Sequence, residues 1–192
     1  MTIMLILLGA ASTLLTAGFG TRARESRRTD ALTSAQAALD SMSREIANSG
    51  YGLEDNGIVS TDSGLQRLHF RANIQNNEAG TAADPLATND PNEDITYYFD
   101  NTTQSILRYD PNEATTTTII VNRISNVNFA YFNYAGSSST VTPVTTPNGG
   151  TGRVTITVTV ELEPVQGQPV NQTVKLTSDV NLRNSIYMRH QY

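Results

Sequence analysis

The chain has 192 residues, of which 38% are hydrophobic and 16% are charged, and its formal net charge is −5. This acidic balance argues against a nucleic-acid-binding protein, which needs a basic face to displace counterions from phosphate. The sequence has no cysteine, which excludes a disulfide-stabilised scaffold, a thiol nucleophile and a Cys-ligated zinc site. The length fits one domain, or one domain with an appendage.

An uncharged and largely apolar segment opens the chain. Residues 1–20 carry no charged side chain. Because about 20 apolar residues cross a bilayer as a helix, we expect residues 1–21 to form an apolar half-helix that lies in a membrane or packs against the same half of other copies. The residues expected to make its assembly surface are Ile3, Leu5, Ile6, Leu7, Leu8, Gly9, Leu14 and Leu15.

Three interpretations of this segment stay open. A cleaved signal peptide would begin with basic residues, and the start of this chain has none. A plain signal anchor fits the apolar character, but the positive-inside rule would then leave the rest of the chain in the cytoplasm, because four arginines follow the segment. The third interpretation is that the natural beginning of the protein precedes Met1. The four arginines are expected to anchor the helix at an interface or to pair with acids of a neighbouring subunit, and they are Arg22, Arg24, Arg27 and Arg28.

Residues 22–50 predict an amphipathic continuation of the same helix. Proline and glycine are absent from Thr21 to Asn48, and Gly50 follows as a residue that commonly ends a helix in the left-handed conformation. Apolar residues recur at alternating steps of three and four, which is the period of one helical face. The residues expected to pack this face onto the rest of the protein are Leu32, Ala35, Leu39, Met42 and Ile46.

Beyond Gly50 the apolar period changes to strict alternation, so residues 51–192 predict a β-rich globular head. The clearest strand is 153–163, where Val and Ile alternate with Thr, and its hairpin partner is expected within 170–182. Long exposed loops are expected at 73–92 and 136–152. Further strands are expected at 65–71, 94–100, 104–109, 117–121 and 124–134. One N-terminal helix packed on an antiparallel sheet is an α+β architecture.

Signals for catalysis are weak, and we predict a non-enzymatic protein without catalytic residues or a cofactor. The two histidines, His69 and His190, are too few for a histidine metal cluster, and no phosphate-binding or nucleophile motif occurs. Oxygen-bearing side chains at alternate positions suit calcium, and Asp90, Asn92 and Asp94 have that spacing. However, the same Asp-Pro-Asn-Glu sequence recurs at 110–113, where it fits a type I turn, so we favour turns over calcium ligands.

Several short motifs resemble the type IV pilins, in particular the PilW-type minor pilins and the J-type pseudopilin of type II secretion. In that family a long N-terminal helix ends in an acidic-basic pair and a Gly-Tyr element, and strands with recognisable residues follow in a fixed order. The matching segments here are Ser43-Arg44-Glu45-Ile46-Ala47-Asn48-Ser49-Gly50-Tyr51-Gly52, Ile95-Thr96-Tyr97-Tyr98, Ile106-Leu107-Arg108-Tyr109, Ile124-Ser125-Asn126-Val127-Asn128-Phe129-Ala130-Tyr131 and Leu182-Arg183-Asn184.

The resemblance implies a structural subunit that assembles through its helix with other pilin subunits into a pilus or a secretion pseudopilus. It also implies residence in the bacterial inner membrane before assembly, contact with the pilus assembly machinery, and a final place in an extracellular or periplasmic filament. Prepilins carry a basic leader and have Glu as the fifth residue of a mature chain whose first residue is methylated, whereas Leu5 stands at the position of that Glu here. We therefore expect about nine mature residues to precede Met1, which would lengthen the apolar helix toward ~30 residues. The alternatives are a subunit that lacks this Glu, and a membrane-anchored β-domain for adhesion or ligand binding that forms no filament.

Overall fold

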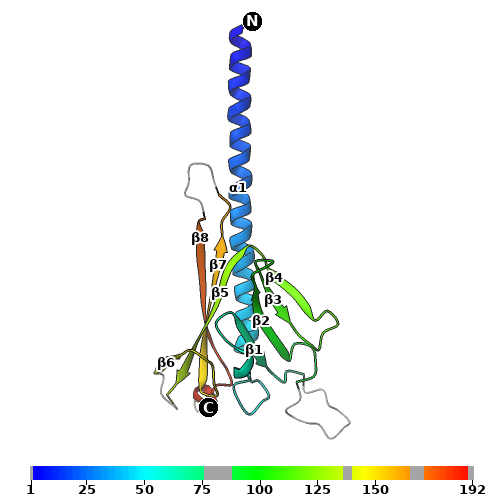
Figure 1. The fold of residues 1–192 in the computed structure, drawn as a ribbon, viewed down its shortest axis with the longest axis vertical. Coiled ribbons are helices and arrows are strands. Elements are labelled where there is room, and N and C mark those ends of the chain that lie inside the picture. Colours follow the sequence, from blue (N-terminus) through cyan, green and yellow to red (C-terminus); the bar gives the residue numbers. More distant parts are fainter. Residues whose placement is uncertain (1, 76–87, 136–139, 165–170, 190–192) are drawn as a thin grey trace.

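The computed structural model describes residues 2–75, 88–135, 140–164 and 171–189, without the side chains of residues 2, 5–8, 10–11 and 13–17. One long helix, α1 (Thr2–Ala47), runs from the far end of the molecule into a β-rich head (Figure 1). The α+β class and the single N-terminal helix are thus confirmed. The other described helical elements are a short 3₁₀ turn at Ser60–Asp62 and a one-turn helix, α2 (Ile186–Arg189). Neither was predicted.

The helix ends where the sequence predicts. Gly50 has φ 77°, a left-handed conformation that a Cβ atom disfavours. A Cβ atom added at Gly50 would also lie 2.4 Å from the carbonyl oxygen of Asp55, because the chain turns back tightly at this point. This turn sends the backbone away from the helix axis and into the first sheet.

The described residues of the head form two four-stranded antiparallel sheets, where a single sheet was predicted. The first sheet has the order β1-β2-β3-β4, and the second has the order β6-β5-β7-β8. The first sheet consists of β1 (Arg67–Arg71), β2 (Asp94–Asp100), β3 (Ser105–Tyr109) and β4 (Thr117–Val121). The second consists of β5 (Ile124–Tyr134), β6 (Val141–Val144), β7 (Thr151–Glu161) and β8 (Thr173–Asn181). Alternating periodicity indicates which segments are strands, but it does not indicate which strands pair. The division into two sheets could therefore not be predicted from the sequence.

The predicted hairpin between the two most regular strands is confirmed, because β7 and β8 pair along their whole length. The loop expected at 136–152 is wrong in part. Val141–Val144 form β6 against the end of β5, and Thr151 and Gly152 already belong to β7. The Thr, Pro and Gly content of this stretch hides a short edge strand, where Pro143 is tolerated because an edge strand needs fewer backbone donors. Residues 76–87 and 136–139 of the expected loops lie outside the described residues.

The core lies between the two sheets and the lower half of α1, which contacts β7 and β8 on one side and β4 on the other (Figure 1). Ala35, Leu39, Met42 and Ile46 are buried there, and Leu32 packs against the same cluster from its margin. The sheets contribute the inward-facing residues of the alternating strands, such as Ile156 and Val158 of β7, to one continuous cluster. Helix and sheets therefore share a single core.

Shortening one of these helix residues should destabilise the whole head. Leu39 is 1% exposed, and we expect Leu39→Ala to lower the free energy of unfolding by about 2–5 kcal/mol, because truncation loses apolar burial and leaves a cavity. Urea denaturation followed by circular dichroism measures this change. Ser34→Ala, on the exposed face of the same helix, is the matched control and should stay within about 0.5 kcal/mol. Equal effects of the two substitutions would contradict the described packing.

Candidate functional site

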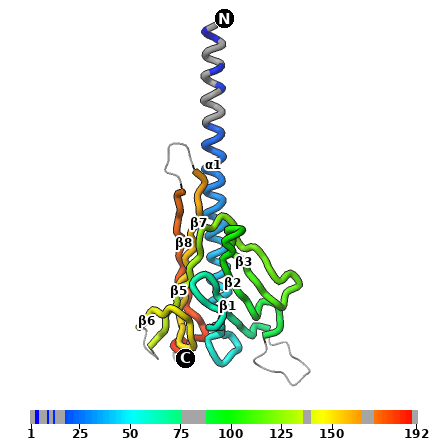
Figure 2. The backbone as a smooth tube through the Cα atoms, in the orientation of Figure 1, coloured from blue at the N-terminus to red at the C-terminus, as the bar shows by residue number. Residues whose placement is uncertain are grey.

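The first candidate site is the half of α1 that projects beyond the head (Figure 2). Among the described contacts, those between α1 and the head begin at Arg27 and Arg28, so residues 2–26 extend for roughly 40 Å at 1.5 Å per residue. Ile3, Met4 and Phe19 are 76%, 79% and 67% exposed along this length. Gly9, another predicted assembly residue, has open space around it. The side chains of the other predicted assembly residues, Leu5, Ile6, Leu7, Leu8, Leu14 and Leu15, lie outside the described part of the structure.

The four arginines lie where the projecting helix meets the head. Arg27 approaches Glu163 with 3.4 Å between Nη1 and Oε2, and the half-buried Arg28 donates to Gln172 Oε1 at 2.6 Å. Arg22 is exposed and Arg24 is half-buried. Two of the predicted interfacial charges thus contact this chain's own head at the end of the β7–β8 hairpin.

The C-terminal segment of the chain closes over the opposite end of α1. The backbone N–H of Arg183 donates to the carbonyl of Ala47 at 3.1 Å, and its side chain donates to Asn48 Oδ1 at 3.1 Å. The side-chain amide of Asn184 donates to the carbonyls of Gly50, Leu53 and Asp55. The carbonyl of Ala47, the last helical residue, is therefore met by Arg183 from the far end of the sequence. The carbonyls of Glu45 and Ile46 accept instead from the backbone N–H groups of the nearby Asn48 and Ser49.

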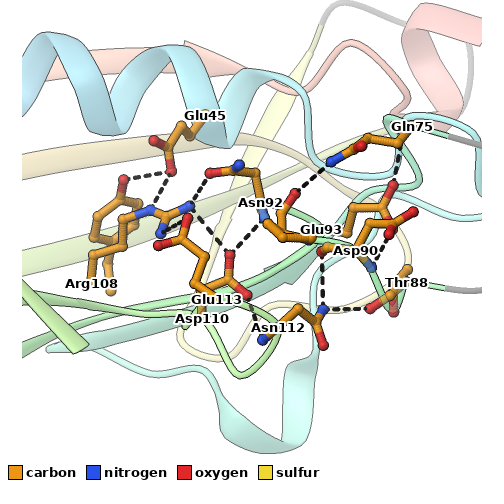
Figure 3. A network of polar contacts seen from close by, with 12 residues as sticks. Glu45, Gln75, Thr88, Asp90, Asn92, Glu93, Arg108, Asp110, Asn112 and Glu113 are labelled. Carbon is orange, nitrogen blue, oxygen red and sulfur yellow. Dashed lines mark hydrogen bonds and ion pairs between the residues drawn. The ribbon is translucent and has the colours of Figure 1, made fainter. Parts of the chain in front are cut away.

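A buried polar cluster joins the helix to the first sheet, and Figure 3 shows it from close by. At its centre is Arg108 of β3, which is 7% exposed. Its guanidinium donates to Glu45 of α1 at 3.1 Å and to Asn92 at 2.6 Å, and it lies 3.5 Å from Asp110, which is fully buried. Glu113 accepts a further bond at 3.2 Å. One arginine thus faces three carboxylates. Burial alone would lower the pKa of Arg108, but Glu45, Tyr97 and Glu113 raise it above the ordinary value.

Glu45 also accepts a hydrogen bond from the Tyr97 hydroxyl at 2.7 Å. Burial, together with this adjacent carboxylate, raises the pKa of Tyr97 far above its ordinary value. The hydroxyl therefore stays protonated and donates its bond at all pH values at which proteins are ordinarily handled.

The two Asp-Pro-Asn-Glu turns lie side by side and are joined by hydrogen bonds. Asp110 of the second turn accepts a bond from the backbone N–H of Asn92 in the first at 2.6 Å. In return, the Asn112 amide donates to the carbonyls of Thr88 at 2.9 Å and Asp90 at 3.1 Å (Figure 3). In each turn the Glu N–H bonds back to the carbonyl of the Asp. The repeat noted in the sequence is therefore a pair of mutually linked turns.

These contacts bear on the calcium candidates Asp90, Asn92 and Asp94. The Asn92 side chain accepts a bond from Arg108, and the Asp94 carboxylate receives His69 and Arg71. Within the described residues, no group of three or more His, Asp or Glu side chains could hold a metal ion. The side-chain oxygens of Asn92 and Asp94 are thus engaged by other side chains of the protein.

Glu93, which the sequence pattern does not single out, is 2% exposed. Its carboxylate accepts backbone N–H bonds from Ile74 at 2.8 Å, Gln75 at 2.9 Å and Asp90 at 3.1 Å. A single buried carboxylate thus fixes both ends of the connection between β1 and β2. Nothing in the sequence marks Glu93 among the other acidic residues, because its three partners are backbone groups.

His69 lies on the outer face of β1, as a strand-face residue. Its Nε2 is 2.5 Å from Asp94 Oδ1, and its Nδ1 is 3.0 Å from Asp62 Oδ2. Burial alone would raise the pKa of Asp94, but the hydrogen bond and charge of His69, together with Arg71, lower it below the ordinary value of 3.8. The cluster ties the 3₁₀ turn and two strands together on the surface of the first sheet.

Removing Arg108, the central cation of the buried cluster, should lower the stability of the protein. We expect Arg108→Met to lower the free energy of unfolding by about 3–5 kcal/mol, because Asp110 and Glu45 would lose their positive partner in a buried site. Urea denaturation measures the difference. Arg123→Met removes an exposed ion pair with Glu163 and should cost less than about 1 kcal/mol. Comparable losses in the two variants would show that the cluster is not a stabilising centre.

The lowered pKa of Asp94 predicts a defined pH dependence. A carboxyl that ionises more readily in the folded state stabilises the protein above its ordinary pKa of 3.8, and this contribution is lost as the pH falls below that value. We expect His69→Gln to raise the pKa of Asp94, as followed by NMR of its carboxyl carbon, and to flatten the acid loss of stability. Arg67→Gln, which changes a neighbouring residue that binds Asp62 instead, should leave the Asp94 titration in place. If the pKa of Asp94 were the same in His69→Gln as in the wild-type protein, the proposed pairing of His69 with Asp94 would be refuted.

Among the residues that the structure describes, no helix holds a stretch both long and apolar enough to cross a membrane. No protein-family model, curated protein or solved structure matches this chain. The arrangement of the projecting helix and of the contacts that fix it to the head is therefore the basis for a functional proposal.

Proposed function

We propose that this chain is a non-enzymatic structural subunit of the type IV pilin kind, which assembles through the projecting half of α1 with the helices of other subunits. The observation that carries the proposal is a rigidly held helix whose residues 2–26 extend past the described contacts with the head. As such a subunit it would be kept at the inner membrane before assembly and then enter a pilus or pseudopilus.

The exposed length of this helix argues for a partner. Helices in water gain most of their stability from packing an apolar face, and an uncovered helix is marginal. Ile3, Met4 and Phe19 are largely exposed along it, and apolar surface that a single chain leaves uncovered marks an interaction site. Packing against neighbouring helices would bury these side chains, and the open space around Gly9, Gly18 and Gly20 leaves room for close approach.

The firm attachment of the helix to the head is a second argument. Arg108 and Tyr97 hold Glu45 from the first sheet, while Arg183 and Asn184 hold the helix end from the C-terminal segment. A subunit that assembles through its helix and presents its head needs such a junction, because otherwise the position of the head would not follow from the packing of the helix.

The same contacts connect the motifs of the resemblance. Glu45, Tyr97 and Arg108 belong to three separate segments that resemble pilin motifs, and they meet in one hydrogen-bonded cluster. The closing Leu-Arg-Asn segment meets the Asn48–Gly50 end of the first of these segments. Each motif alone is weakly specific, but the meeting of the motifs around Glu45, Tyr97, Arg108 and Arg183 at the helix–head junction supports the pilin proposal.

A second candidate function is an anchored β-domain that binds a ligand or a surface without forming a filament. It is favoured by the exposed Arg22 and the half-buried Arg24, which directly follow the uncharged segment and would suit anionic headgroups. The two candidates differ in what covers the helix, and this difference can be measured.

A charge in the projecting helix should separate assembly from folding. In cells that produce the full protein, we expect Phe19→Asp to remove the subunit from sheared surface fibres seen by electron microscopy and immunolabelling, because a buried unpaired carboxylate is unfavourable between packed helices. The head should still fold, since Phe19 is 67% exposed. Ser26→Asp, on the exposed and already charged part of the helix, is the matched control and should leave the fibres labelled.

Mass spectrometry of the N-terminal peptide from native material complements this test. A methylated start ahead of Met1, with Glu as the fifth residue, would support prepilin processing. Unlabelled fibres with the wild-type chain, together with a chain held only in the membrane fraction, would refute the filament proposal and leave the anchored β-domain.

A further inference from the structure

The outer edge of β4 is a second interaction surface, separate from the projecting helix. β4 is the last strand of the first sheet, with β3 on one side. Thr117 and Thr118 are exposed, and Ile119 is 59% exposed. From Thr115 to Val121 every residue is β-branched, and the stretch has neither a charge nor a proline. Such a strand has a strong tendency to pair with another strand of the same kind.

The other three sheet edges carry the features that natural proteins use to prevent pairing. Residues 57–59 cover β1, through the bonds of Val59 N–H to His69 and of Arg71 N–H to Gly57. Strand β6 is short and contains Pro143. Strand β8 carries Lys175 and contacts α1. Charge, proline, short length and coverage are the usual protections of an edge strand. Strand β4 has five residues and touches α1, but it carries neither a charge nor a proline.

An exposed apolar row leads to this edge across the outer face of the first sheet. The strand register places Tyr98 of β2 beside Leu107 of β3, and Leu107 beside Ile119 of β4. Tyr98 and Leu107 are half-buried, and Arg67 covers the far end of the row from 5.5 Å above the Tyr98 ring. At its other end the row stops at the exposed Ile119, on the edge strand. A further strand paired with β4 would place one of its side chains beside Ile119 and extend the row.

We propose that β4 pairs in antiparallel fashion with β4 of a second copy of this chain, with Ile119 opposite Ile119. This register continues the apolar row of one copy into that of the other. It also sets Thr117 opposite Val121 and Arg123 opposite Thr115, so no like charges meet, and like charges would weaken a strand pair. Two-fold pairing of one surface with itself is the commonest way in which soluble chains associate.

The pair does not depend on the proposed function of the helix. A two-fold axis perpendicular to the sheet reverses directions within the sheet, and α1 runs along the sheets (Figure 1). The two α1 helices of a β4 pair therefore point in different directions and cannot belong to one parallel bundle. A pair made through one strand of five residues is a small contact, so we expect it to form at high protein concentration and to dissociate on dilution.

These 192 residues contain no cysteine, which allows a direct test by disulfide trapping. Directly opposite residues of antiparallel strands have Cα atoms about 4.5–5.5 Å apart, within the range of about 4.4–6.8 Å that a disulfide spans. In mild oxidant, with detergent present to cover the projecting helix, we expect Ile119→Cys to shift from monomer to covalent dimer on a non-reducing gel. Thr177→Cys, exposed on β8 of the other sheet, should stay monomeric.

A charge swap provides the second measurement. Ile119→Lys and Ile119→Glu should each sediment as monomers at concentrations where the wild type dimerises, and a mixture of the two should recover dimers, because opposite charges then face each other. Circular dichroism confirms that the variants are folded. Equal trapping of Ile119→Cys and Thr177→Cys, no trapping at Ile119, or failure of the mixture to associate would each overturn the proposal.

Discussion

Most of this structure depends on the burial of one helical segment, residues 35–46 of α1, between two sheets that contact each other through the same core. Neither sheet closes on itself, and each leaves an apolar face that needs a cover. The helix supplies that cover to both, and Leu39, Met42 and Ile46 are at most 1% exposed as a result. The position of the sheets, the path of the chain after Gly50 and the direction of the projecting half all follow from this packing.

The polar contacts fix the rotation and the axial position of α1, which apolar packing alone would not determine. Apolar burial is non-directional, so a helix held only by Leu39 and Met42 could rotate or slide with small changes in energy. The bonds from Tyr97 and Arg108 to Glu45 fix its rotation, and the bonds from Arg183 to Ala47 and Asn48 fix its axial position. Buried polar groups in this protein thus specify a unique arrangement, at a site where leaving one partner unpaired would be unfavourable.

The parts of the fold that the sequence predicts are those that local rules determine. The helix follows from an apolar stripe and the lack of Pro and Gly after Gly20, and β7 follows from its alternating Val, Ile and Thr residues. The division into two sheets could not be predicted, because pairing depends on contacts between distant strands. The roles of Glu93 and Asn184 were equally hidden, since both bind backbone groups whose positions only the folded chain supplies. The Asp-Pro-Asn-Glu repeat was visible, but not that its two copies bond to each other.

The alignment of α1 with β7 and β8, nearly along one axis in Figure 1, has a mechanical consequence. A pull on the projecting end of the helix reaches the second sheet along the direction of its strands, while the inter-strand hydrogen bonds lie across that direction. The bonds between β7 and β8 then carry the load together, in shear, instead of opening one after another as in unzipping. With Arg183 and Asn184 fastening the base of the helix to the end of β8, tension would tend to draw the whole head along as one body before any strand separates.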